Sequence, residues 1–566
     1  MLKRIATYRI ITIITCTLSF LNALVYFSMR CIWSGIGKTL NNPMIPDLLL
    51  IVFVGVALAT WLFAWLRWEK ILMVVMLIIT IALDVGLFFI IKLGASDYLH
   101  FIFREFIDAL IYSLIIMAIF WVIFYYSTSK LAQMRVVRSL LMAIIILGTL
   151  AFALGLGINK LDLYPTVYAV EDEYQIIFTT TTDATVWIEV GEDTYYDLYA
   201  GSQKSESKVH KVSLPMSALD EAKAYTIHIQ QILMRGPYGG YKGREKSYDF
   251  NFRPVDTSDG FDYYSISDIH GKRDAAIHVG SYLKDKLDVL FILGDVSSFL
   301  EKKVDIELIG RVAYGITKGE IPVVYARGNH ETKGVLADQL YRYVGSKNEK
   351  FYFTFRLGPI WGVVLDGGED HLDDWWEYYG LAHFEKYRDE QTEFLEAIIA
   401  NKNEEYQAPG VQFKIALCHF AIPYVHRSGF LADIKANWTE LLNEIDIDVH
   451  YCGHEHELIP IIPGTFTPNT PLVYSNPLYT TKKSTNEGHF TDAKFPSFVV
   501  SKHDDDQDIV NSQSQLDGKM TGVASHVDAD FTELTVRFTN RYHEEIKIVD
   551  PFGPTNYGTE IVIFLE

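Results

Sequence analysis

The chain has 566 residues, with Lys+Arg 50 and Asp+Glu 70 and a formal net charge of −20, and this length is too great for one ordinary domain. Residues 1–160 carry a net charge of +7 and the remainder carries −27. No nucleic acid is expected as a main partner, because binding to phosphate backbones needs a basic face. Only four cysteines are present, so no disulfide framework follows, and Cys418 and Cys452 are interpreted as buried free thiols.

The first 160 residues contain five long apolar segments. Each has about the length needed to cross a ~30 Å hydrocarbon core as a helix. The segments are Ile10–Met29, Leu48–Leu66, Ile71–Ile91, Ala109–Tyr126 and Leu140–Ile158. They predict a transmembrane region with about five helices and a lipid bilayer as a partner. The first segment is too long for a cleaved signal peptide and lacks a small-residue cleavage site.

The orientation of this region follows from the Lys and Arg residues between the segments. The N-terminus and the second and fourth connections carry eight such residues, and the first and third carry four. The richer side is expected in the cytoplasm, which puts residues after about Lys160 outside it. Asp84 lies inside the third segment, where a carboxyl hydrogen-bonded between helices is favoured over a functional acid.

Residues 164–255 change to short strands with alternating polarity, separated by polar turns. The expected strands are Tyr174–Thr180, Ala184–Val190, Lys208–Leu214 and Ala224–Leu233. This spacing predicts a β-sandwich. His210 and His228 have no companion ligands in the sequence and are interpreted as surface or interface histidines.

From about residue 258 the pattern alternates strands with helices. Strands are expected at Phe261–Ser267, Val289–Leu293 and Ile321–Ala326, with a helix at about residues 273–287 between the first two. This order predicts a partly parallel sheet. Later strands are expected at residues 351–356, 360–365, 413–417, 448–451, 472–475, 496–501 and 533–539, with a polar loop at residues 502–519, so a mixed core of two sheets is predicted.

Short polar blocks follow these strands, at the place where α/β folds present their chemistry. The blocks are Asp268-Ile-His270, Gly294-Asp295, Gly328-Asn329-His330-Glu331, His419 and Gly453-His454-Glu455-His456. Mixed carboxylate and imidazole ligands suit Mn, Fe, Zn or Co better than Ca. Two adjacent divalent ions need a bridging carboxylate and can share a hydroxide, because metal binding lowers the pKa of water toward ~7. The blocks together therefore predict two divalent metal ions.

These residues resemble the calcineurin-like metallophosphoesterase superfamily over about residues 258–545. The resemblance implies a four-layer α/β/β/α sandwich with a dinuclear metal site. Carried over by position within the motifs, the ligands are Asp268, His270 and His456 for the first metal, Asn329, His419 and His454 for the second, and Asp295 as the bridge.

The resemblance also implies catalytic roles for Asp295, His330 and Glu331. A hydroxide that bridges the metals would attack phosphorus in line. His330 would bind no metal and would stabilise or protonate the leaving oxygen, with Glu331 supporting the site from behind. The implied substrate is a phosphate ester, either a monoester or a diester.

Two departures from the family narrow the choice of branch. Asp295 is followed by Val-Ser-Ser-Phe instead of the Asp-Arg-Gly continuation of the protein Ser/Thr phosphatases. Purple acid phosphatases place a Tyr ligand at the position of Ser298 and lack the histidine of the first block, where this chain has His270. A purple Fe(III) site is therefore not expected, although residues 164–255 resemble the fibronectin-III-like domain of purple-acid-phosphatase-type proteins.

The predicted fold class is multidomain. It comprises a transmembrane region (1–160), a fibronectin-III-like β-sandwich (164–255), an α/β/β/α metallophosphoesterase domain (258–545) and a C-terminal extension (546–566). The predicted function is a membrane-anchored phosphoesterase that acts outside the cytoplasm. A receptor or transporter with a phosphoesterase-derived ligand-binding domain, and a cytoplasm-facing nucleotide phosphoesterase, are the alternatives.

The sequence leaves the substrate, the metal identity and the oligomeric state open. Arg327 precedes the third block and can equally reach a phosphate or point away from it. The stretch Asp366–Tyr379 is rich in acidic and aromatic residues and is interpreted either as a wall of the substrate site or as a cover for the core.

Overall fold

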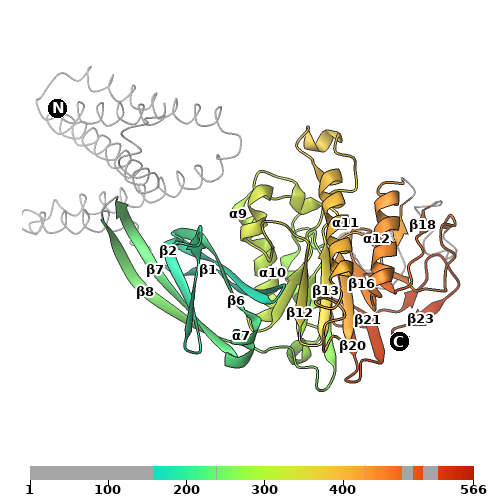
Figure 1. Cartoon of the computed structure of the whole chain (residues 1–566), viewed down its shortest axis with the longest axis horizontal. Helices are drawn as coiled ribbons and strands as arrows, with labels where there is room; N and C mark the ends of the chain where they lie inside the picture. Colours follow the sequence, from blue (N-terminus) through green and yellow to red (C-terminus); the bar gives the residue numbers. More distant parts are fainter. Residues whose placement is uncertain (1–158, 237–238, 427–428, 474–487, 501–519, 566) are drawn as a thin grey trace, which may run out of the picture. The chain divides into compact units, whose positions relative to one another are not determined.

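The computed structural model describes residues 159–565 except 237–238, 427–428, 474–487 and 501–519. The chain divides into two compact units, one of Met1–Ile158 with Ile232–Lys242 and one of Asn159–Gln231 with Gly243–Glu566. The described residues are drawn in colour in Figure 1. The strands, helices and candidate site belong to the second unit, apart from residues 232–242.

The larger sheet of the described chain has 12 strands in the order β24-β21-β20-β9-β10-β11-β1-β2-β7-β8, with β3 and β6 also paired to β2. These strands are β1 (Leu161–Val170), β2 (Glu173–Val190), β3 (Asp193–Tyr196), β6 (Ser207–Pro215), β7 (Ala224–Gly236), β8 (Gly239–Asn251), β9 (Phe261–Ile266), β10 (Val289–Ile292), β11 (Pro322–Tyr325), β20 (Thr521–Val527), β21 (Glu533–Asn540) and β24 (Ile561–Phe564).

A second sheet has six strands in the order β12-β13-β14-β16-β19-β17. They are β12 (Phe353–Leu357), β13 (Ile360–Leu365), β14 (Phe413–Cys418), β16 (Val449–Cys452), β17 (Ile459–Ile461) and β19 (Ser497–Val499). Three small antiparallel pairs are β4 (Leu198–Tyr199) with β5 (Gln203–Lys204), β15 (Tyr424–Val425) with β18 (His489–Phe490), and β22 (Ile548–Val549) with β23 (Asn556–Gly558).

Helices cover the two sheets. They are α7 (Met216–Ala222), α8 (Arg273–Gly280), α9 (Lys303–Ile306), α10 (Leu308–Thr317), α11 (Phe384–Ala400) and α12 (Ala432–Ile445), with 3-10 turns η2 (Lys284–Lys286), η3 (His330–Thr332), η4 (Ala337–Arg342) and η5 (Trp376–Tyr378). Helices α8 and α10 pack together beside β1 and β9. Helix α11 packs beside α12 (Figure 1). Leu395 of α11 and Trp438 of α12 share a buried cluster with Val363 of β13.

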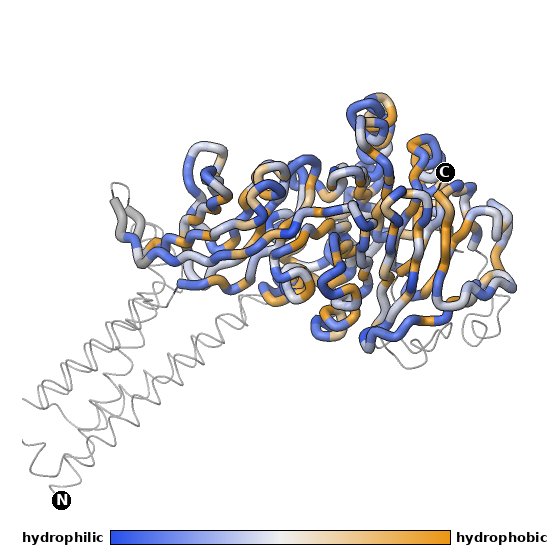
Figure 2. Tube along the Cα trace, turned by 90° about the horizontal axis from the view of Figure 1, so that it is seen from below, coloured by the Kyte–Doolittle hydropathy of each residue, from blue (hydrophilic) through white to orange (hydrophobic). Residues whose placement is uncertain are grey.

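The two sheets face each other across a common apolar core. Phe291 of the larger sheet and Phe355 of the smaller one belong to the same buried cluster. The hydroxyls of Tyr263 and Tyr451 meet across the sheets at 2.9 Å. Hydrophobic and hydrophilic residues alternate along the extended segments in the middle of the described chain (Figure 2). The order of layers is therefore helix, sheet, sheet, helix.

The strands β9, β10 and β11 are parallel and adjacent. All four residues of β10 and all four of β11 are buried, as expected for parallel strands with both faces covered. In the smaller sheet, β13, β14 and β16 are likewise parallel. The carboxyl ends of neighbouring parallel strands lie at one edge, which collects the loops that follow them.

The predicted β-sandwich of residues 164–255 is not found as a separate two-sheet unit in the described chain. Strand β1 pairs in parallel with β11, with Tyr168 opposite Val323, so these strands continue the larger sheet. Two of the predicted strands form one 18-residue strand, β2, with a register shift between Thr179 and Ala184. Alternating polarity shows that one face of a strand is buried, but it does not show which strand lies beside it.

The predicted fold class also needs correction in its membrane part. Among the residues that the structure describes, no helix has both the length and the apolar character to span a bilayer. The described chain has a sheet-rich α/β fold, and a five-helix transmembrane region is not seen in it. The five predicted segments and Asp84 lie outside the described residues.

Two smaller expectations differ from the structure or fall outside it. The helix expected at residues 273–287 ends at Gly280, and Lys284 has a positive φ of 52°, which stops a regular helix there. The polar loop expected at residues 502–519 lies outside the described residues, as does the end of the strand expected at 472–475.

Candidate metal centre

The predicted ligands lie on tight loops directly after the parallel strands. Five of them have positive φ angles: Asp268 (53°), His270 (44°), Asp295 (52°), His454 (71°) and His456 (52°). This region costs a residue with a side chain roughly 1–2 kcal/mol. Side-chain to backbone hydrogen bonds offset part of that cost, because the His454 amide donates to Asp268 at 3.1 Å and the His330 amide donates to Asp295 at 3.0 Å.

One cluster of metal-ligating groups contains Asp268, His270, Asp295 and His456, with one candidate ligand atom from each lying within 4.8 Å of the others. The Nε2 atoms of His270 and His456 face each other at 3.1 Å. Asp268 Oδ1 lies 3.3 Å from His456 Nε2. The structure therefore brings together the three residues predicted for the first ion and the predicted bridge.

A second cluster contains Asp295, His419 and His454 within the same 4.8 Å limit. His419 Nδ1 lies 2.6 Å from the Leu293 carbonyl, so Nδ1 carries a proton and Nε2 faces Asp295 Oδ2 at 3.2 Å. Asp295 is common to both clusters, as a bridging carboxylate would be.

Asn329, the amide predicted for the second ion, lies on the loop next to Asp295, because the amide of the following residue, His330, donates to Asp295. Asn329 is buried, and its Nδ2 donates to Glu369 at 3.3 Å. Its Oδ1 is buried and makes no hydrogen bond to any described residue. Buried polar atoms normally have a partner. The donor set and this unpartnered oxygen fit divalent cations, so the residues present are suited to hold the implied metals.

Glycines allow the strand-end loops to approach one another. A Cβ on Gly328 would lie 2.1 Å from Asp295 Oδ1 and 2.3 Å from its amide nitrogen. Gly294 has φ +87°, and a Cβ there would lie 2.4 Å from the Gly328 amide. Any side chain at either position would therefore push the two loops apart.

Glu331 holds the same two loops from behind. Its carboxylate accepts hydrogen bonds from the amides of Asp295 at 2.8 Å, Gly328 at 3.0 Å and Ser297 at 3.0 Å. Its side chain is fully buried. Glu331 therefore supports the loops that carry the predicted bridge and Asn329.

His330 lies at the open side of the site. Its Nδ1 is 2.7 Å from the Ser298 carbonyl, and its Nε2 is 3.9 Å from Asp295 Oδ2. Its side chain is 27% exposed, so the ring borders solvent. The ring contacts His270 edge-on at 4.7 Å between centroids.

The pKa values of the ligands reflect their mutual charges. Burial opposes ionisation of Asp295, but the adjacent His419 lowers its pKa well below the usual range. Burial alone would lower the pKa of His419, yet the Asp295 carboxylate raises it to about 10. Burial lowers the pKa of His270 to about 4. Burial and the Asp295 charge raise the pKa of Glu331 to about 7. A metal ion would have to displace the proton from His419.

The sequence interpretation treated Asp366–Tyr379 as a wall of the substrate site or a cover for the core, and it did not assign Glu369 or Asp370 to contacts with the predicted ligands. Glu369 and Asp370 reach Asn329 and His454. The missed signal is Gly367-Gly368-Glu369-Asp370-His371 directly after a strand, a pattern like that of the other blocks. Glu369, Asp370 and His371 also form a third cluster of metal-ligating groups, but Lys333 Nζ, 2.8 Å from Glu369, already supplies a cation there.

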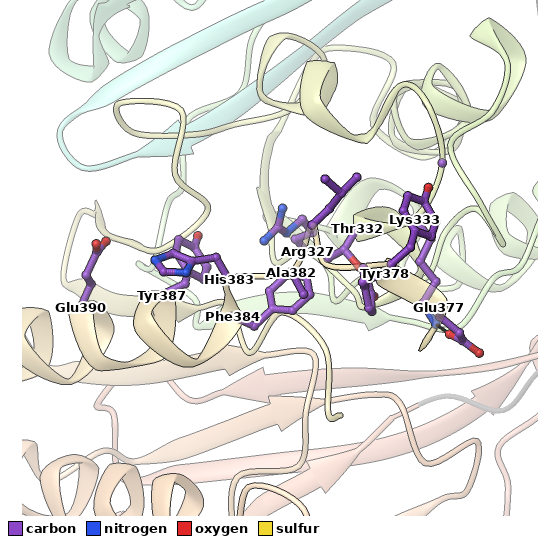
Figure 3. A pocket seen from close by; sticks show the side chains of 13 residues that line it. Arg327, Thr332, Lys333, Glu377, Tyr378, Ala382, His383, Phe384, Tyr387 and Glu390 are labelled. Atoms are coloured by element: carbon purple, nitrogen blue, oxygen red, sulfur yellow. Dashed lines mark hydrogen bonds and ion pairs between the residues drawn. The ribbon is translucent and has the colours of Figure 1, made fainter. Parts of the chain in front are cut away.

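A cavity of about 410 Å³ lies beside Lys333 and Tyr378 (Figure 3). It is also lined by Phe384 and Tyr387, and Arg327 borders it. The Arg327 guanidinium forms an ion pair with Asp366 at 2.7 Å and lies over the Phe351 ring. Its charge is therefore directed to Asp366. Part of the acidic and aromatic stretch after β13, Glu377 to Tyr379, lines this cavity.

Sequence comparison agrees with the chemistry of the site. The profile described as calcineurin-like phosphoesterase matches residues 263–458. The match runs from β9 to just beyond His456 and contains every predicted ligand. A calcineurin-like phosphoesterase domain implies a phosphate-ester substrate and divalent metal cofactors. No curated protein sequence matches the chain.

Solved structures give more distant likenesses. The chain is similar to purple acid phosphatase PPD1 from yellow lupin (Lupinus luteus), with 15% identity, a TM-score of 0.41, and 71% of this chain and 74% of that chain covered. It is similar to PhoD with 11% identity, a TM-score of 0.37, and 71% and 88% covered. Both TM-scores are below 0.5, so neither likeness assigns a role to a residue of this site.

Proposed function

We propose that this metal-dependent phosphoester hydrolase works with two divalent ions that share Asp295. Asp268, His270 and His456 would hold the first ion, and Asn329, His419 and His454 the second. The observation that carries the proposal is that Asp295 is a member of both ligand clusters. The ions would be Mn, Fe, Zn or Co, since the ligands mix carboxylate, amide and imidazole groups.

Two bound divalent ions would activate water at neutral pH and withdraw charge from the phosphoryl oxygens. The chain itself orients the other groups. His330 donates Nδ1–H to the Ser298 carbonyl, which fixes its ring and leaves Nε2 to hold a proton for the leaving oxygen. A positioned histidine of this kind contributes about 10²–10⁴-fold to proton transfer.

Glu331 and the two glycines maintain the geometry in which these groups act. The three backbone amides bound to Glu331 fix the positions of the Asp295 and Gly328 loops. Preorganised groups of this kind need no rearrangement during the reaction.

The test uses the purified full-length protein. We expect about two metal ions per chain and hydrolysis of p-nitrophenyl phosphate or its bis ester in the presence of Mn²⁺. Chelation should remove the activity and Mn²⁺ should restore it. The ratio of monoester to diester rates defines the substrate class. A lack of hydrolysis with Mn, Fe, Zn and Co would contradict the proposal and favour a ligand-binding domain.

We also propose that the hydrolase acts outside the cytoplasm and is attached to a membrane by residues before 159. The support is the apolar composition of residues 1–160 and the distribution of their Lys and Arg residues. A substrate held near a bilayer, such as a lipid head group or an envelope polymer, would then be within reach. Protease added to intact cells should cleave the phosphoesterase domain, and protection of the domain would contradict the location.

A further inference from the structure

The loop after β13 is anchored by hydrogen bonds to α11 beside the candidate metal centre. Gln391 of α11 accepts from the Asp366 amide at 2.7 Å and donates to its carbonyl at 2.6 Å. Arg388 of the same helix donates to the carbonyls of Gly367 at 3.1 Å and Glu369 at 2.9 Å. Arg388 and Gln391 are buried. Helix α11 therefore fixes the position from which Glu369 and Asp370 reach the site.

Glu369 determines how the Asn329 amide is turned. A carboxylate can only accept hydrogen bonds, so the NH₂ group of Asn329, 3.3 and 3.5 Å from the two Glu369 oxygens, faces it. The Asn329 Oδ1 is then directed elsewhere, and this buried atom has no partner among the described residues. Lys333 at 2.8 Å and the Tyr378 hydroxyl at 2.9 Å hold Glu369 in place.

Asp370 contacts the His454 side chain, as Glu369 contacts the Asn329 side chain. Its Oδ2 lies 3.4 Å from His454 Nε2, while its Oδ1 lies 2.6 Å from His371 Nδ1. A carboxylate next to an imidazole nitrogen favours the tautomer with the proton on that nitrogen. The His454 Nδ1 is then unprotonated and available as a ligand. Metal-binding histidines commonly have such a carboxylate partner.

We propose that Glu369 and Asp370 are positioning residues for the second metal ion, one for each of two ligands. Glu369 presents the oxygen of Asn329, and Asp370 presents the Nδ1 of His454. The inference rests on the proposed dinuclear function. Both contacts reach ligands assigned to the second ion, so the loss of either acid should weaken one ion much more than the other.

The experiment titrates metal-depleted full-length protein with Mn²⁺ in a calorimeter. Glu369→Leu and Asp370→Ala should each weaken one of the two Mn²⁺ affinities by about 10–100-fold, the usual effect of removing such a partner, and should change the other less than about threefold. Electron paramagnetic resonance should show a coupled Mn²⁺ pair in the wild type and an uncoupled ion in the variants at the same Mn²⁺ concentration.

Conservative and control variants separate positioning from general damage. Glu369→Gln and Asp370→Asn keep an acceptor oxygen, so they should recover most of the lost affinity. Glu377→Gln is the matched control, because Glu377 also pairs with Lys333, at 2.9 Å, and has no assigned ligand contact. It should leave both affinities unchanged.

Three outcomes would overturn the inference. They are equal weakening of both ions, unchanged affinities in the Leu and Ala variants, and complete loss of one ion in Asp370→Ala, which would make Asp370 a direct ligand. If wild-type protein binds two ions and hydrolyses the ester while the variants bind normally, only this inference fails. If the wild type binds no metal, the proposed function itself fails.

Discussion

Strand β10 carries a carboxylate at each end, and the two carboxylates differ in their ionisation. Asp288 precedes the strand and accepts the Asp262 amide at 2.9 Å, and burial raises its pKa to about 7. Asp295 follows the strand and is more deeply buried, yet its pKa is lowered because His419 and other histidines surround it. Burial alone therefore does not determine the charge of an acid at this sheet.

The smaller sheet also has an acid with a raised pKa just before one of its strands. Asp448 precedes β16, accepts the Lys414 amide at 2.7 Å, and has a pKa raised to about 6 by burial. The loops after β14 and β16 instead bring His419, His454 and His456 together with the acids of the larger sheet. The difference arises because the carboxyl-end loops of both sheets converge, and their histidines stabilise the ionised acids.

The largest expected effect appears when the acids at the two ends of β10 are replaced one at a time. Asp295→Asn should reduce phosphoesterase activity by at least about a thousandfold, the equivalent of about 4 kcal/mol in transition-state stabilisation. Asp288→Asn should change activity less than about twofold, because it lies at the other end of the strand. Steady-state rates with Mn²⁺ measure both. Similar losses in the two variants would show that the ends are not functionally distinct.

His330→Ala should give the next largest effect. We expect a fall in kcat of about 10²–10³-fold for an alkyl phosphate, whose leaving oxygen needs a proton. The fall should be clearly smaller for p-nitrophenyl phosphate, since p-nitrophenolate leaves readily without one. Rates for a series of leaving groups of rising pKa measure the difference. An equal loss across the series would assign His330 to substrate binding.

Gly328→Ala should be somewhat milder. The new methyl group would lie 2.1 Å from Asp295 Oδ1, and displacing a reacting group by about 1 Å can cost about 100-fold in rate. The matched control is Gly191→Ala, which has φ +59° but no neighbour within 4 Å and should lose only about 1 kcal/mol of stability. Activity and thermal unfolding of both variants test this. Full activity in Gly328→Ala would mean that the loops can separate without harm.

The smallest effect concerns stability at the amino edge. The pKa of Asp288 is raised from 3.8 to about 7, so the folded state favours the protonated form. The contribution of protonated Asp288 to the free energy of unfolding is fully present below pH 4 and is lost as the pH rises through about 7. Asp288→Asn resembles the protonated acid and should gain Tm relative to wild type between pH 4 and 8. A difference in Tm that is independent of pH would exclude this explanation.

Much of the candidate site was predictable from local sequence. Asp268, Asp295 and Asn329 each follow a short buried strand, and parallel strands end at a common edge. Residue chemistry then indicated which metals suit them. The contribution of Glu369 was not predictable in the same way, because it depends on where α11 holds the loop after β13 and on which ligand lies opposite.

The sequence alone determined the types of the candidate ligands, their order and their places at strand ends, since these follow from residue chemistry and short-range periodicity. Tertiary structure decided that Asp295 is shared by both clusters, that Arg327 turns to Asp366, and that Asp370 meets His454. It also decided that β1 and β2 extend the larger sheet. The physical reason is that alternating polarity defines the faces of a strand, whereas its neighbour is chosen by contacts between residues far apart in the chain.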